Sequence, residues 1–125
     1  MTRYRLSRLA EIDLARILRV SDASWGAEGR QRYRAAVAAA LRKAAAEPFG
    51  AASRDRAELG HGVRSLHLRH ARAETAGARV GRPVHVVFYR AAGPGLIELV
   101  RVLHERMDPA WHPPAWHPGD TADET

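Results

Sequence analysis

Residues 84–104 carry the strongest secondary-structure signal in the chain, and they read VHVVFYRAAGPGLIELVRVLH. The runs at 84–90 and 96–104 are rich in β-branched, aliphatic and aromatic side chains, and AAGPG at 91–95 is typical of a turn. This spacing predicts an antiparallel β-hairpin. Because both runs are apolar on both faces, we expect helices to cover one face and the C-terminal tail or a partner chain to cover the other.

A further strand is expected before this hairpin. Residues 63–68 alternate in polarity, with Arg64, Leu66 and Leu68 pointing to one side, which is typical of a β-strand. The preceding segment, 51–62, is polar and contains two glycines, so it is predicted to be a loop.

The N-terminal part of the chain is predicted to supply the helices. Ser7 is a suitable N-cap, and apolar residues recur at helical spacing over 8–20 and again over 27–46. SDASWG at 21–26 contains turn-forming residues, so the two helices are expected to form an antiparallel hairpin. A short strand is expected at 4–6, before the first helix.

Together these elements predict an α+β fold, with an N-terminal strand and an antiparallel helical hairpin packed on a small, mainly antiparallel sheet. We assign residues 1–108 to one domain and 109–125 to a tail rich in Pro and Trp and partly mobile. The prolines favour an extended path. Trp111 and Trp116 are large apolar side chains, and we expect Trp111 in particular to pack on the domain.

Composition excludes several classes of protein. The 125 residues include no cysteine, which excludes disulfides and cysteine-ligated zinc, and no apolar stretch approaches the roughly 20 residues that span a bilayer. We therefore expect a cytoplasmic protein without a membrane segment. Residues 1–106 carry 20 basic and 10 acidic side chains, whereas 107–125 carry four acids and no Lys or Arg. A body this basic should attract a polyanion or an acidic protein segment.

The strands carry a set of cationic and proton-transferring side chains. They are Arg64, Arg69, His85, Tyr89, Arg90, Arg101 and His104. A metal-independent nuclease could use such groups, with a His or Tyr moving protons and arginines stabilising the phosphate. Strand residues of these types are, however, more often solvated or paired with acids. No spacing of the histidines indicates a metal site, and no cofactor-binding motif is present.

Two positions on the last predicted strand can be placed more closely. Regular alternation puts Arg101 on the face of Leu99 and Leu103. It puts His104 on the opposite face, so the two side chains are not expected to act together. An equally weighted alternative for Arg101 is a structural ion pair with an acid of the first helix.

The acids of the first helix that could form this pair are Glu11 and Asp13.

The order of these elements, with their particular residues, resembles the RelE/ParE superfamily of type II toxins over about residues 4–108. The segments that carry the resemblance are YRLSRLAEIDLARIL at 4–18, Trp-Gly at 25–26, EPFGAASRDRAELGHGVRSLHL at 47–68, VVFYR at 86–90 and IELVRVLHERMD at 97–108. The last segment is more similar to the ParE, or plasmid-stabilisation, branch. The lysines usual in RelE-type nucleases are missing, because Lys43 is the only lysine.

The resemblance implies a cytoplasmic toxin that arrests growth until a cognate antitoxin binds it through an acidic segment. ParE-like members poison DNA gyrase and have no established catalysis, whereas RelE-like members are ribosome-dependent mRNA endonucleases. It also implies that operator DNA is contacted only through the antitoxin, in a heterotetramer or larger complex. The favoured hypothesis is a ParE-like gyrase inhibitor without a cofactor. An mRNA interferase and an inactive interaction module are the alternatives.

The same resemblance implies which residues are candidates for the functional site. Arg64 and Arg101 are predicted to contact anions or carboxylates, and Arg90 and His104 to recognise the target or the antitoxin. Were the protein a nuclease, Arg64, Tyr89, Arg101 and His104 would be its catalytic candidates.

Overall fold

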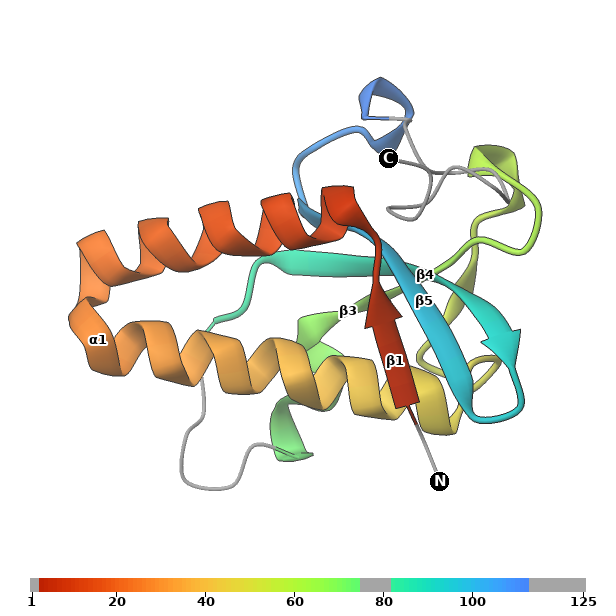
Figure 1. Cartoon of the computed structure of the whole chain (residues 1–125), viewed down its shortest axis with the longest axis horizontal. Helices are drawn as coiled ribbons and strands as arrows, with labels where there is room; N and C mark the ends of the chain where they lie inside the picture. Colours follow the sequence, from red (N-terminus) through yellow and green to blue (C-terminus); the bar gives the residue numbers. More distant parts are fainter. Residues whose placement is uncertain (1–2, 75–81, 113–125) are drawn as a thin grey trace.

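The predicted hairpin of strands forms the centre of the sheet in a computed structural model, which describes residues 3–74 and 82–112. The sheet has five strands in the order β1-β5-β4-β3-β2, and only the β1–β5 pair is parallel (Figure 1). The strands are β1 (Arg3–Leu6), β2 (Arg54–Asp55), β3 (Arg64–His67), β4 (His85–Gly93) and β5 (Leu96–His104). The predicted α+β fold is thus confirmed, including its mainly antiparallel sheet.

The helices form the predicted hairpin, but its bend is shorter than the sequence indicated. Helix α1 (Arg8–Ala46) runs through residues 21–25, which were predicted to be a turn. Only Gly26 leaves the helical conformation, with φ of 74°, a value that glycine adopts without strain. The helix therefore folds back on itself as two antiparallel arms (Figure 1). Ser7 is its N-cap as predicted, because its hydroxyl accepts a hydrogen bond from the Ala10 amide.

The main core lies between α1 and one face of the sheet. Alanines of the second arm let the helix approach the strands closely, and the aliphatic side chains of the strands fill the remaining space. The strand residues buried in this core are Leu66, Val87, Tyr89, Ile97, Leu99 and Val102.

The opposite face of the sheet is covered in part by the segment that was predicted to be a polar loop. This segment forms β2 and a 3₁₀ turn, η1 (Ala57–Leu59). Leu59 packs against a second buried cluster, and the Arg56 guanidinium lies 5.4 Å from the centre of the Phe88 ring. The cluster consists of Val63, Phe88, Val100 and Leu103. A cover for this face was expected from the tail or a partner, yet the chain supplies at least part of it from residues before β3.

Strand β5 does not alternate regularly, which corrects the predicted placement of Arg101. The pairing of β4 with β5 shifts register between Phe88 and Tyr89, which leaves Val100 as an extra residue. In consequence Leu99 and Val102 both belong to the helix-side core, although they are three residues apart. Arg101 instead pairs across the strands with Phe88, whose side chain lies in the second cluster. The predicted shared face of Arg101 and Leu99 is therefore wrong.

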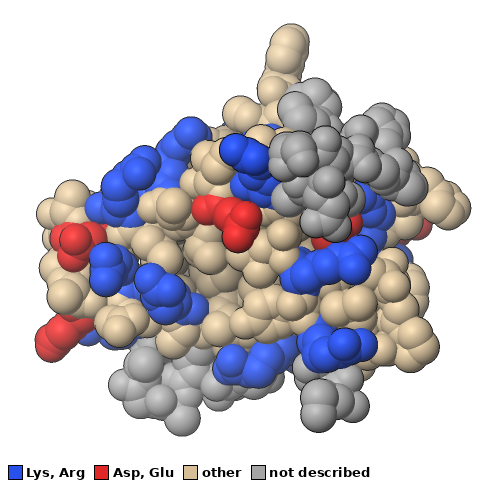
Figure 2. Space-filling view, in the orientation of Figure 1, with Lys and Arg blue, Asp and Glu red and all other residues tan. Residues whose placement is uncertain are grey.

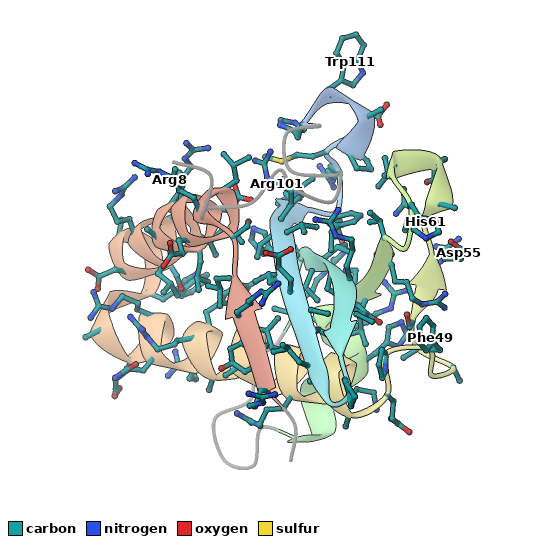
Figure 3. All side chains as sticks on the ribbon, turned by 45° about the vertical axis from the view of Figure 1, so that its right-hand side comes forward. Arg8, Phe49, Asp55, His61, Arg101 and Trp111 are labelled. Carbon is teal, nitrogen blue, oxygen red and sulfur yellow. The ribbon has the colours of Figure 1, made fainter. Side chains whose placement is uncertain are left out.

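The end of the described chain also differs from the prediction. Pro109–Trp111 form a 3₁₀ turn, η3, instead of an extended path, because the Asp108 carboxylate accepts the Ala110 amide. Trp111 is 80% exposed and projects away from the domain (Figure 3), so its predicted packing is wrong. The domain contacts this part of the chain through the backbone, because Arg101 donates a hydrogen bond to the His112 carbonyl. Trp116 lies outside the described residues.

The η2 turn (Leu68–Glu74) follows β3 directly, so Leu68 closes the strand and does not belong to it. Its side chain is nevertheless buried in the main core, as the alternating pattern indicated. No helix in residues 3–74 and 82–112 combines the length and the apolar character needed to cross a membrane.

Candidate functional site

Arg101 forms a buried ion pair with Asp13 of α1 (Figure 3 labels Arg101). Its Nε donates to Asp13 Oδ2 at 2.8 Å and its Nη2 donates to Oδ1 at 2.9 Å, a bidentate arrangement. The remaining nitrogen, Nη1, donates to the His112 carbonyl at 3.0 Å. The structural alternative considered for Arg101 is thus confirmed, with Asp13 as the acid. Each guanidinium nitrogen already has a partner within the fold.

The same pair closes an exposed part of the sheet edge. Strand β1 pairs with β5 only as far as Leu99, so the backbone beyond it lacks a neighbouring strand. There the Ser7 hydroxyl donates to the Val100 carbonyl, and Asp13 Oδ2 accepts the Val102 amide at 3.0 Å. The start of α1 therefore replaces a strand along this edge, and Asp13 serves both the edge and Arg101.

Arg90 lies in a second charged cluster, on the β1 side of the sheet. Its Nη2 is 3.4 Å from Glu98 Oε1, and the other carboxylate oxygen of Glu98 is 3.6 Å from Arg5 Nε. The three residues are cross-strand neighbours on β4, β5 and β1. Arg90 and Glu98 are 8% and 5% exposed, so this is a buried pair with an exposed arginine on its outer side.

Tyr89 and Arg64 meet in a third cluster, beyond the C-terminal end of α1. The Tyr89 hydroxyl donates to the Pro48 carbonyl at 2.7 Å and lies 2.6 Å from the Ser53 hydroxyl. The Arg64 Nε donates to that same serine at 2.7 Å, and its guanidinium lies 5.1 Å from the Phe49 ring centre. Burial raises the pKa of Tyr89, so the phenol stays protonated at neutral pH.

His104 belongs to a fourth group of side chains, and the sequence pattern did not predict that they lie together. Its ring packs edge-to-face on His85, with ring centres 5.4 Å apart, and its Nδ1 accepts the Arg106 amide. The His85 Nδ1 is in turn 2.5 Å from the Tyr33 hydroxyl. His85 was among the candidate side chains of the strands. Tyr33 lies on α1, where the sequence pattern indicated only an apolar position of a helix.

The contacts of Tyr33, together with burial, favour a neutral His85. The Val84 amide donates to the Tyr33 oxygen at 3.2 Å, so the phenol proton is free to go to His85 Nδ1. His85 is then neutral, with its proton on Nε2. Burial, reinforced by repulsion from His104, lowers the pKa of His85 to about 4. Burial also raises the pKa of Tyr33, which agrees with its role as donor.

The four nuclease candidates are therefore not all brought together, although Arg101 and His104 line one small hollow. Arg64 and Tyr89 share one cluster, Arg101 is bound to Asp13, and His104 is in contact with His85. In the part of the chain that the structure describes, no group of three or more His, Asp or Glu side chains is placed to hold a metal ion.

A further concave feature lies at the bend of α1, next to His85 and Tyr33. A hollow of about 480 Å³ opens between the two arms of the helix and the start of β4. Ile17 and Trp25 from the helix and Val84 from the strand segment give it an apolar lining, and Tyr33 and His85 also line it. Trp25 is 72% exposed. The Trp-Gly pair at 25–26 was part of the family resemblance, but composition and periodicity did not indicate a hollow there.

A family model and individual relatives were compared with the chain, and both point to the same family. Residues 4–109 match the family model described as the ParE toxin of the type II toxin-antitoxin system, parDE. The chain is 35% identical to Toxin ParE1 of Mycobacterium tuberculosis over 107 residues, which cover 86% of this chain and 93% of that protein, with the same values in two strains. It is also 35% identical to Toxin ParE of Escherichia coli, over 86% of this chain and 89% of that toxin.

Proposed function

The chain belongs to the ParE toxin family of type II toxin-antitoxin systems, and we propose that it arrests growth by binding and inhibiting DNA gyrase. It does so as a protein ligand, without turning over a substrate and without a cofactor. A cognate antitoxin neutralises it by direct binding in the cytoplasm.

One observation carries the preference for binding over catalysis: the groups that a nuclease would need are divided between two places, and Tyr89 and Arg101 already have hydrogen-bond partners within the chain. Tyr89 is fully buried and donates to the Pro48 carbonyl. Arg101 is 8% exposed, and each of its nitrogens has a partner within the chain. A phosphate bound there would have to displace Asp13, which would leave a buried carboxylate without its counter-charge.

The surface charge supports an acidic partner. Figure 2 shows Lys and Arg side chains along both arms of α1, with fewer acidic side chains between them. The antitoxin segment that neutralises the protein is therefore proposed to be acidic. Operator DNA is contacted only through that antitoxin, in a heterotetramer or larger complex.

The four predicted recognition residues fall into two pairs that differ in exposed fraction. Arg64 and His104 are partly exposed, and we assign them contacts with the target or the antitoxin. Arg90 and Arg101 are each 8% exposed, and their larger contribution is to the stability of the sheet. The recognition roles of all four residues stay predictions.

The test is pulse labelling after controlled induction in a host that lacks the antitoxin. Thymidine and methionine incorporation are followed in the same culture over the first minutes. Early failure of thymidine incorporation, with a DNA-damage response, is the expected result. Early failure of methionine incorporation would instead favour a ribosome-dependent mRNA endonuclease of the RelE type, and unaffected growth would indicate an inactive interaction module.

Purified components separate these outcomes further. The protein should inhibit DNA supercoiling by gyrase, and addition of antitoxin should restore it. Cleavage of mRNA on ribosomes, with supercoiling unaffected, would contradict the proposal.

A further inference from the structure

The hollow at the bend of α1 has the features of a small-molecule site, and the proposed function assigns it no role. Its volume of about 480 Å³ is within the range typical of ligand pockets, roughly 300–1,000 Å³. Apolar side chains of α1 and of the residue before β4, including Ile17, Val20 and Val84, form most of its lining. Such a lining suits a flat or branched apolar body.

One wall of the hollow depends on a glycine. A Cβ atom on Gly29 would lie 2.2 Å from the Cβ of Trp25, a separation that real atoms do not reach. Glycine at this position thus lets Trp25 lie across the second arm of the helix. The indole is left largely exposed beside the hollow, where it can contact the face of a ligand.

The opposite side of the hollow is held in place by hydrogen bonds. The Val84 amide donates to the Tyr33 hydroxyl, which donates to His85 Nδ1. This chain joins the second arm of α1 to the start of β4, so the two sides of the hollow are fixed relative to one another. Pre-organisation of this kind reduces the entropy cost of binding.

The charge around the hollow is positive. Arg32 and Arg82 line it, and no Asp or Glu does. Neither guanidinium forms an ion pair with a described residue, although Arg82 is near enough to Glu105 to add to the lowering of its pKa that the hydrogen bond from His67 causes. Two arginines beside an apolar lining match an anionic head group on an apolar body.

We propose that this hollow binds a small organic anion, a carboxylate attached to a flat aromatic body, with the aromatic part against Trp25 and Val84 and the carboxylate at Arg32 and Arg82. The proposal is independent of gyrase inhibition, because it concerns a ligand of the toxin and no step of its action on a target.

The test uses 2-naphthoate as the probe and 2-naphthamide, its neutral analogue, as the matched control. Each is titrated into the full-length protein labelled with ¹⁵N, and the tryptophan indole signals are followed by NMR. A Trp25→Phe variant identifies the Trp25 signal. We expect 2-naphthoate to shift the Trp25 signal and the Val84 amide with one saturating curve, while the Trp111 signal stays in place.

Charge variants test the head-group contact. Arg32→Gln/Arg82→Gln should raise the dissociation constant for 2-naphthoate at least fivefold and leave that for 2-naphthamide unchanged. Arg8→Gln/Arg54→Gln removes the same net charge at exposed positions away from the hollow, and should leave both constants unchanged. Both pairs are on the surface, and matching amide spectra confirm that each variant is folded.

Three results would overturn the proposal: shifts confined to Trp111, equal affinity for the acid and the amide, or equal losses in the two double variants. The last would mean that only overall charge attracts the probe. None of these results bears on gyrase inhibition, which is measured separately.

Discussion

The charged side chains of the sheet and those at the bend of α1 differ in how they are bonded. Arg90 and Arg101 are each 8% exposed and face Glu98 and Asp13, whereas Arg32 at the bend is exposed and forms no ion pair with a described residue. Residue type alone made the sheet arginines the stronger functional candidates. A cation on a strand can thus be part of the fold, while the cations available to a partner lie at the bend of α1, where the sequence pattern was less distinctive.

The largest effect is expected from breaking the Arg101–Asp13 pair on one side only. Arg101→Ala leaves the Asp13 carboxylate buried without its counter-charge, and should lower the free energy of unfolding by about 3–5 kcal/mol. Chemical denaturation followed by circular dichroism measures the loss. Arg8→Ala, at an exposed arginine of the same helix, is the control and should change stability by less than about 0.5 kcal/mol.

A double variant tests the same ion pair by removing both charges. Asp13→Asn/Arg101→Met removes both charges and keeps an oxygen that can accept the Val102 amide. It should recover most of the stability lost in Arg101→Ala. A double variant as unstable as the single one would contradict the assignment of this pair as a charge-compensated unit.

The next effect concerns the bend. Gly29→Ala places a Cβ on that of Trp25 and should cost about 1–3 kcal/mol, the range for overpacked sites. Thermal unfolding measures it. In a Trp25→Gly background the obstructing atom is gone, so the same substitution should add almost no loss; an unchanged loss in that background would show that the contact is not its cause.

A smaller effect should appear in the pH dependence of stability. The pKa of His85 is lowered to about 4 from 6.5, chiefly by burial, so between these values the unfolded chain binds a proton that the folded chain does not. Stability should therefore fall as the pH drops from 6.5 to 4. His85→Gln should flatten this part of the profile, whereas His61→Gln, at an exposed loop position, should leave it unchanged.

The pKa of His85 tests whether Tyr33 donates a hydrogen bond to its ring. Tyr33→Phe removes the donor to His85 Nδ1, which favours the neutral ring, so the pKa of His85 should rise. NMR titration of the ring protons measures it. A pKa that stays the same or falls would mean that the phenol does not donate to His85.

Much of the fold could be predicted because its signals are local. Strand β5 was predicted with its observed bounds, and the N-cap of α1 with its observed residue, since both depend on short patterns of apolar and capping side chains. The pairing of β1 with β5, and the extra residue at Val100, depend on contacts distant in sequence and left no such pattern. Residues 21–25 stayed helical because Gly26 alone suffices for the bend.

The candidate site was less predictable for the same reason. The sequence named Asp13 as one of two acids that could pair with Arg101, but only the structure shows that Asp13 also binds the edge of β5. The hollow combines Trp25 and Tyr33 on α1 with His85 on β4, and no spacing along the chain relates them. A Trp-Gly pair followed by a second glycine was the one local sign of a close approach.

Arg101 stabilises the fold through Asp13, and we propose that the protein inhibits gyrase by binding without a contribution from this arginine. The most direct test of this proposal is DNA supercoiling by purified gyrase in the presence of the wild-type protein or of Asp13→Asn/Arg101→Met, after circular dichroism shows that both are folded. We predict equal inhibition at equal concentration. A folded double variant that leaves supercoiling unaffected, while the wild-type protein inhibits it, would contradict this prediction and indicate that Arg101 contacts the target.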